Sequence, residues 1–173
     1  LPEFAAIDHV RFSPDGSRVA FTNTTESGLE LWVINVQTAK AERIHSTLNG
    51  VLSVRERPFA WISDRAALIA KTVPSSRGAP PEMSGVPNGP TIQQTTGEVS
   101  PARTYQDLLK NRHDEAVFGY YAKSQLVVVN EDGNIKKVGA PAIYAKISPS
   151  PDGELLLVEK LERPFSYLVP YSR

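Results

Sequence analysis

Short runs of alternating apolar and polar residues, separated by turn-forming residues, fill the N-terminal part of the chain. Alternation with a period of two is typical of β-strands that bury one face, and Pro, Gly, Asp and Ser between such runs favour tight turns. The pattern therefore predicts a four-stranded antiparallel meander. Its strands are expected at residues 7–12, 17–23, 29–36 and 41–45.

The turn sequence Ser-Pro-Asp-Gly occurs twice, at 13–16 and at 150–153. Proline presets one turn dihedral, aspartate bonds to nearby backbone, and glycine takes the positive φ that starts the returning strand. A degenerate copy of the turn and its flanking strands lies at 59–70. Its aspartate follows that of the first copy by about 49 positions and precedes that of the last by about 88, which indicates three repeats.

Repeats of about 40 to 50 residues that each form a four-stranded meander are typical of β-propeller blades. We therefore predict an all-β chain that forms part of a β-propeller, with blade one at 5–48, blade two at 54–140 and the start of blade three at 142–173. A propeller closes with about four to eight blades, so the chain is interpreted as a segment of a larger protein. A free-standing open β-sandwich is the alternative.

The second predicted blade contains an insertion at 74–123. Its first part, 74–101, is rich in Pro, Gly, Ser and Thr and lacks periodicity, which predicts a long loop. Strand character returns at 125–129 and 135–138, and the residues between them, 131–134, are typical of a turn. The insertion is therefore expected to interrupt a second meander without changing its strand order.

Two short amphipathic helices are predicted inside this insertion. Ser100 and Pro101 are typical of an N-cap and a first helical residue, and apolar side chains within 105–109 would then share one face. Asp114 is expected to cap the second helix, whose apolar residues lie within 116–121.

The composition mainly excludes classes of partner and of chemistry. Nineteen Lys and Arg balance nineteen Asp and Glu, so no net charge attracts nucleic acid or anionic lipid over long range. No apolar run approaches the roughly 20 residues that span a bilayer, and no cysteine is present for a disulfide, a thiolate zinc site or a Cys nucleophile. The chain begins with Leu1, which agrees with removal of a leader or with excision from a longer polypeptide.

No residue of the chain is nominated as catalytic, cofactor-binding or metal-ligating. Neither G-x-S-x-G nor a glycine-rich phosphate loop occurs, and His9, His45 and His113 are scattered over separate predicted elements. Three ligand types adjoin at 113–115, but adjacent side chains diverge. The acidic stretch at 130–134 resembles a fragment of a calcium loop, yet a hairpin turn is the better interpretation.

The C-terminal stretch at 161–171 concentrates aromatic residues and prolines, and it is interpreted as a core strand with edge prolines rather than as a ligand contact. Several segments resemble the propeller region of glutamyl endopeptidases, in the prolyl oligopeptidase superfamily of serine peptidases. These segments are KTVPSSRG at 71–78, TYQDLLKN at 104–111, HDEA at 113–116, SPSPDGELLLVE at 148–159 and ERPFSYLVPYSR at 162–173.

The resemblance implies a multidomain enzyme with an N-terminal propeller and a C-terminal α/β-hydrolase domain that carries a Ser-Asp-His triad. It implies cleavage of peptides after Glu, without a cofactor, in the bacterial periplasm or secreted space or in plant plastids. No triad residue matches a position of this chain, and glutamate recognition is assigned neither to Arg163 nor to Arg173 nor to any other arginine. The chain alone is therefore expected to be catalytically silent.

In this interpretation the propeller segment gates the access of peptides to the hydrolase domain, which would be its intramolecular partner. Nucleic acid and membranes are not expected partners. An alternative is a TolB-like propeller module that binds partner proteins without enzymatic activity and uses the insertion at 74–123 as its contact element. A small self-sufficient β domain is a third possibility, against which concentration-dependent association through an unpaired edge strand would argue.

Overall fold

A computed structural model describes residues 4–53, 56–62, 67–82, 108–130 and 134–168. In this part of the chain the regular structure consists of antiparallel strands and one helix, α1 (Arg112–Ala122). The strands are β1 (Ala6–Phe12), β2 (Arg18–Thr25), β3 (Gly28–Asn35), β4 (Ala41–Leu48), β5 (Phe59–Ile62), β6 (Ala67–Thr72), β7 (Ser124–Val129), β8 (Ile135–Pro149) and β9 (Leu156–Leu161). The secondary structure of the described residues confirms the predicted all-β class.

The first unit is the meander predicted from the sequence, because β1, β2, β3 and β4 pair in chain order and antiparallel. Within it, β2 and β3 pair without a break from Arg18 opposite Asn35 to Thr25 opposite Gly28. The pairing of β1 shifts between Asp8 and Arg11, in a stretch where His9 adopts a φ of +52°.

Both Ser-Pro-Asp-Gly turns form the hairpins that the sequence predicts. In the first turn the Gly16 N–H donates to the Ser13 carbonyl at 2.9 Å, and in the last the Gly153 N–H donates to the Ser150 carbonyl at the same distance. The two glycines have φ values of +72° and +70°, which L-residues rarely adopt. Residues 63–66 of the degenerate copy lie outside the described residues, and its flanks form the antiparallel pair β5 and β6.

The second unit consists of β5, β6, β7 and the first part of β8. Separate strands were expected at 135–138 and 143–147, but both belong to the continuous strand β8. The first part of β8 pairs with β7 and the second part with β9, and Gly139 has a φ of +62° near the change of partner. The expectation of two strands was therefore wrong, because one bent strand serves two successive ladders.

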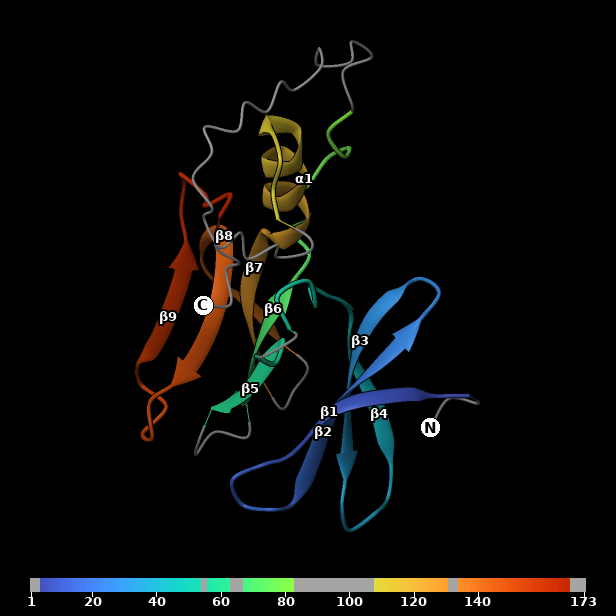
Figure 1. Ribbon diagram of the computed structural model, residues 1–173. Coiled ribbons are helices and arrows are strands. Elements are labelled where there is room, and N and C mark those ends of the chain that lie inside the picture. Colours follow the sequence, from blue (N-terminus) through green and yellow to red (C-terminus); the bar gives the residue numbers. More distant parts are fainter. Residues whose placement is uncertain (1–3, 54–55, 63–66, 83–107, 131–133, 169–173) are drawn as a thin grey trace, which may run out of the picture.

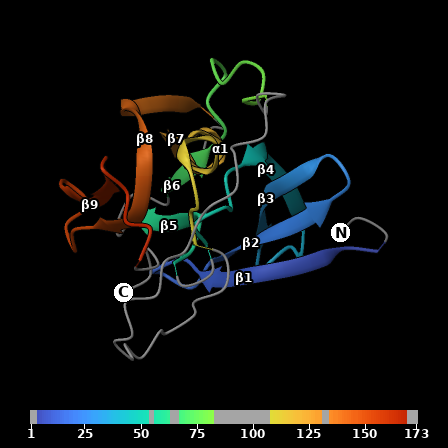
Figure 2. The same cartoon turned by 45° about the horizontal axis from the view of Figure 1, so that its top comes forward.

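The units pack through the faces of their sheets (Figure 1), and their ladders meet only at the pair Leu48 and Thr72 among the described residues. Every residue of β6 is buried. Leu68 and Ala70 belong to a core shared with the first unit, whereas Ile69 belongs to a core shared with β8 and β9. β6 therefore lies between two apolar layers, and Figure 2 shows the first unit and β8–β9 on opposite sides of it.

The helix predictions are confirmed in part. α1 corresponds to the second predicted helix, but its N-cap is Asn111, whose side chain accepts from the Asp114 N–H, and not Asp114. The first predicted helix lies mostly outside the described residues. Leu108 and Leu109, which were expected on it, are described and are not helical.

The interpretation of the C-terminal stretch as a core strand was wrong. β9 ends at Leu161, and the described residues that follow, 162–168, are not in a strand and are mostly exposed. Phe165 instead packs against the small apolar cluster formed by Leu52, Ala122 and Ile143. Residues 162–168 therefore cover α1 instead of extending the sheet.

Candidate functional site

A cleft of about 790 Å³ opens beside α1, and we refer to it as the α1 cleft. Four segments that are distant in sequence line it: residues 74–77 after β6, the face of α1 and its end at 116–123, the bend of β8 at 141–143, and residues 161–165 at the end of β9. The helix is placed at one end of β6 and β7 (Figure 1), so the cleft lies at the edge of the second unit.

The C-terminal end of α1 is held by two side chains from outside the helix. Nδ2 of Asn49 donates to the carbonyls of Tyr121 and Lys123, at 2.9 Å each. Nη2 of Arg77 donates to the same two carbonyls at 3.1 and 3.3 Å, and its guanidinium lies 5.3 Å from the centre of the Tyr120 ring. Because the last carbonyls of a helix lack intrahelical partners, these contacts fix α1 and one wall of the cleft.

The opposite wall is the segment after β9. An oxygen of Glu115 lies 3.5 Å from Nη1 of Arg163, and the other oxygen accepts a 2.6 Å hydrogen bond from the Tyr167 hydroxyl. That hydrogen bond is the main cause of the raised pKa of Tyr167. Phe118 and Phe165 meet edge to face, with ring centres 5.2 Å apart. Polar and aromatic contacts together dock this segment on α1.

Cationic side chains and an apolar lining characterise the α1 cleft. Arg77, Lys123 and Arg163 line it, whereas its described lining contains no Asp or Glu. Ile143 and Leu161 contribute apolar surface. Guanidinium and ammonium groups around an apolar surface can bind an anionic group that is carried on an apolar stem. The described lining therefore offers cationic and apolar groups that suit binding of such a molecule.

The residues considered at the sequence level are not brought together. His9, His45 and His113 lie on β1, β4 and α1, and none of them lines the α1 cleft. Burial lowers the pKa of His45. Asp114 accepts from the Lys110 N–H and Glu115 points to Arg163, so these adjacent carboxylates serve separate contacts. In the described part of the chain no three His, Cys, Asp or Glu side chains group as metal ligands.

The sequence alone did not single out Arg77 or Lys123. Arg163 was named, but which residues lie near it in space was not predicted. Arg77 and Lys123 lie near the two ends of the insertion at 74–123 and Arg163 follows β9, so their approach depends on how α1 packs. One signal was available: Arg77 and Arg163 both lie in segments that resemble the same peptidase family.

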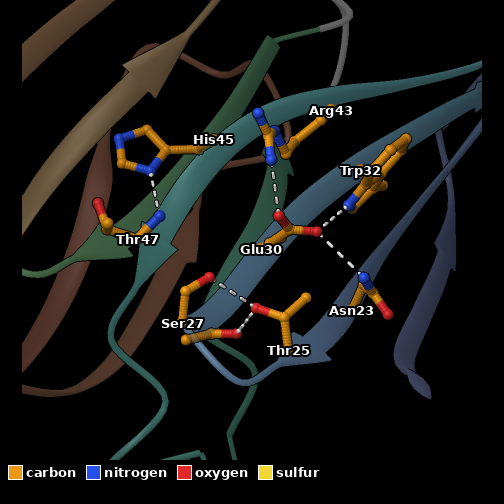
Figure 3. A network of polar contacts seen from close by, with 9 residues as sticks. Asn23, Thr25, Ser27, Glu30, Trp32, Arg43, His45 and Thr47 are labelled. Carbon is orange, nitrogen blue, oxygen red and sulfur yellow. Dashed lines mark hydrogen bonds and ion pairs between the residues drawn. The ribbon is translucent and has the colours of Figure 1, made fainter. Parts of the chain in front are cut away.

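A second polar group, in the first unit, is structural in character. The carboxylate of Glu30 accepts hydrogen bonds from Nε1 of Trp32 at 2.7 Å, Nδ2 of Asn23 at 3.0 Å and Nη1 of Arg43 at 2.9 Å (Figure 3). Its side chain is 8% exposed. Burial raises the pKa of Glu30, but the three donors outweigh burial and hold the pKa below its usual range. A carboxylate with three donors crosslinks β2, β3 and β4.

Lys71 is the other buried charge. It lies on β6 and is 1% exposed, and its Nζ has no hydrogen-bond partner among the described residues. Burial lowers the pKa of Lys71 to about 8, although nearby Glu56 opposes this shift. Its location is not the α1 cleft.

None of the helical structure that the described residues form is long and apolar enough to cross a membrane. No family profile matches the chain. A solved structure, the Pyrococcus horikoshii acylaminoacyl peptidase, is similar to 80% of this chain and 18% of that chain, with 16% identity and a TM-score of 0.42. A TM-score this low carries no argument about fold.

Two plant proteins match the chain along its length. The "Probable glutamyl endopeptidase, chloroplastic" of Oryza sativa subsp. japonica is 40% identical over 179 residues, which cover 99% of this chain and 19% of the relative. The protein of the same name from Arabidopsis thaliana is 41% identical, with 100% and 18% covered. This chain thus spans about a fifth of the length of these curated relatives. The resemblance seen in the sequence is confirmed, and the chain corresponds along its whole length to one segment of the glutamyl endopeptidases.

Proposed function

We propose that this chain is a non-catalytic β-propeller segment of a serine peptidase that cleaves after Glu, and that it controls which peptides reach a C-terminal α/β-hydrolase domain. The observation that carries the proposal is the 40% identity to a glutamyl endopeptidase over 99% of this chain. Identity at this level over a whole segment supports a common fold and a corresponding place in a longer protein.

The packing of the strands supports a propeller with blade one at 5–48, blade two at 54–140 and the start of blade three at 142–173. In a propeller, sheets stack face to face around an axis, so an internal blade is buried on both faces. β6 has this environment, with one apolar core on each side. β8 also passes from the ladder of the second unit into the ladder with β9, which is how one blade would lead into the next.

The division of labour follows from the chemistry of the described residues. The α1 cleft offers cations and apolar surface, and the histidines lie on three separate elements. Nucleophile, base and oxyanion donors are therefore assigned to the hydrolase domain, and the propeller contributes size selection and peptide contacts. In a plant, the location would be the plastid, as the names of the relatives indicate. In a bacterium it would be the periplasm or the secreted space.

The test uses the full-length protein that carries this chain. We expect it to hydrolyse a peptide that contains Glu, to leave the peptide with Gln in that position intact, and to lose activity after treatment with a serine-directed covalent inhibitor. Mass spectrometry of the products identifies the cleaved bond. Absent hydrolysis, or hydrolysis that the inhibitor does not affect, would overturn the proposal and favour a propeller that binds partner proteins without enzymatic activity.

A further inference from the structure

We propose that the α1 cleft binds the carboxylate side chain of an acidic peptide. The inference goes beyond the proposed function, because it assigns a binding site to named residues, and it rests on that function only for the choice of a peptide as the molecule that carries the carboxylate. Three cations, Arg77, Lys123 and Arg163, come from separate segments and converge on one cleft whose described lining contains no acid. Their charges favour an anion in the cleft, and they lie in a protein whose formal net charge is zero.

Arg77 is held in place before any ligand arrives. Its Nη2 is used by the carbonyls of Tyr121 and Lys123, and its guanidinium rests over the Tyr120 ring. Its Nε is buried and has no partner among the described residues. A guanidinium that its neighbours already hold in place loses little conformational freedom when it binds a ligand oxygen.

Arg163 faces the cleft from the other wall and is oriented by two neighbours. Its guanidinium lies 5.5 Å from the centre of the Phe165 ring and 3.5 Å from an oxygen of Glu115. The other oxygen of Glu115 is taken by Tyr167, so this carboxylate is shared between two donors. The Arg163 side chain is 60% exposed, which leaves donors for a ligand.

The shape and lining of the cleft suit a side chain rather than a bare ion. A volume of about 790 Å³ is within the range of roughly 300–1,000 Å³ that is typical of ligand pockets. Ile143, Leu161 and Phe165 give it apolar surface, which fits the methylene groups that carry a glutamate carboxylate.

The experiment uses anisotropy to measure binding of two fluorescent peptides to the full-length protein, which is first treated with the serine-directed covalent inhibitor so that neither peptide is cleaved. The peptides are identical except that one carries Glu where the other carries Gln, and mass spectrometry verifies that both stay intact during the measurement. We expect the Glu peptide to bind about tenfold more tightly, as charge-assisted hydrogen bonds imply. Inorganic phosphate should compete only weakly.

Variants locate the site. Lys123→Gln and Arg163→Gln should each weaken binding of the Glu peptide by about five- to tenfold and leave binding of the Gln peptide unchanged. Arg163→Lys should restore part of the loss. Lys137→Gln, which removes an exposed lysine of β8 outside the cleft, is the matched control and should have no effect. Melting temperatures of all variants separate lost binding from lost folding.

The outcomes distinguish this inference from the proposed function. Equal affinity for the two peptides, or an equal loss with the control variant, would overturn the inference even if the protein hydrolyses peptides. Displacement of the Glu peptide by low concentrations of inorganic phosphate would also overturn it, because the cleft would then be a general anion site. Selective binding that depends on Lys123 and Arg163 would support it even if no hydrolysis occurs.

Discussion

At the scale of the residue, the sheets contain buried polar groups that differ in how well they are satisfied. Glu30 has three donors, and one of them, Asn23, also accepts from the Ala6 N–H at 2.9 Å, so the network reaches from β1 to β4. Lys71 has no hydrogen-bond partner among the described residues. A satisfied buried carboxylate stabilises a sheet, whereas an unpaired buried ammonium destabilises it.

Replacing Glu30 should therefore be costly. Glu30→Ala leaves the Trp32 N–H and the Asn23 amide without their acceptor, and we expect the free energy of unfolding to fall by about 2–4 kcal/mol. Urea unfolding measures the change. The matched control is Glu42→Ala, which removes an exposed carboxylate from neighbouring β4 and should cost less than about 0.5 kcal/mol. Equal losses in both variants would contradict this account of the network.

The lowered pKa of buried Lys71 predicts that the free energy of unfolding depends on pH. The unfolded chain keeps the lysine protonated up to its ordinary pKa of 10.5, whereas the folded chain releases the proton near a pKa of about 8. Between these values the unfolded state binds more protons, so stability should rise with pH by an amount on the order of 3 kcal/mol.

The variant Lys71→Leu removes this titration. At pH 7 its free energy of unfolding should be higher than that of the original chain by about 1–3 kcal/mol, which urea unfolding measures. Its stability should no longer rise between pH 8 and 10. Lys137→Leu changes an exposed lysine and should retain the rise. A rise that persists in Lys71→Leu would show that another group causes it.

At the scale of the element, α1 depends on tertiary contacts because an isolated helix of 11 residues is marginal in water. Asn111 caps its first turn, and Asn49 and Arg77 cap its last carbonyls. The Asn49 side chain belongs to the segment after β4, so the first unit helps to position a helix that the sequence inserts into the second.

Removing this anchor should loosen the helix selectively. We expect Asn49→Ala to lower the free energy of unfolding by about 1–3 kcal/mol, because two helix carbonyls lose a buried donor. Hydrogen exchange should accelerate in α1 more than in β2 or β3. Gln37→Ala, at an exposed turn position, is the control. Uniform acceleration across the sheet would show instead that the anchor supports the whole fold.

At the scale of the whole molecule, the described sheet order runs from β1 to β9, and both end strands carry exposed apolar side chains. Phe12 is 64% exposed on β1, Leu157 is 73% exposed on β9, and Leu155, just before β9, is 73% exposed. Large exposed apolar groups at strand edges favour pairing with another surface. In the proposed propeller, neighbouring blades would cover them.

The chain produced alone should therefore associate as its concentration rises. Sedimentation velocity measures this, and the double substitution Phe12→Lys with Leu157→Lys should reduce it. A control with two lysines at exposed polar positions, Thr38→Lys and Gln37→Lys, should not. A chain that stays monomeric at high concentration would support a self-sufficient β domain instead of a propeller segment.

Local patterns predicted the strands of the first unit and both Ser-Pro-Asp-Gly turns, because alternation, proline and glycine act within a few residues. These patterns failed where residues that are distant in sequence but close in space determine the secondary structure. Two expected strands are one strand, since β8 has partners on both sides of its bend, and the aromatic stretch after Leu161 packs on α1 through Phe165 instead of pairing as a strand.

The sequence by itself determined the antiparallel class, the two Ser-Pro-Asp-Gly turns and the relation to one segment of glutamyl endopeptidases, since these depend on short-range periodicity and on residue identity along the chain. Only the tertiary structure decided which charges meet. Arg77, Lys123 and Arg163 reach one cleft because Asn49 holds the end of α1 and Glu115 holds the segment after β9. Such contacts join residues far apart in sequence, and no local pattern encodes them.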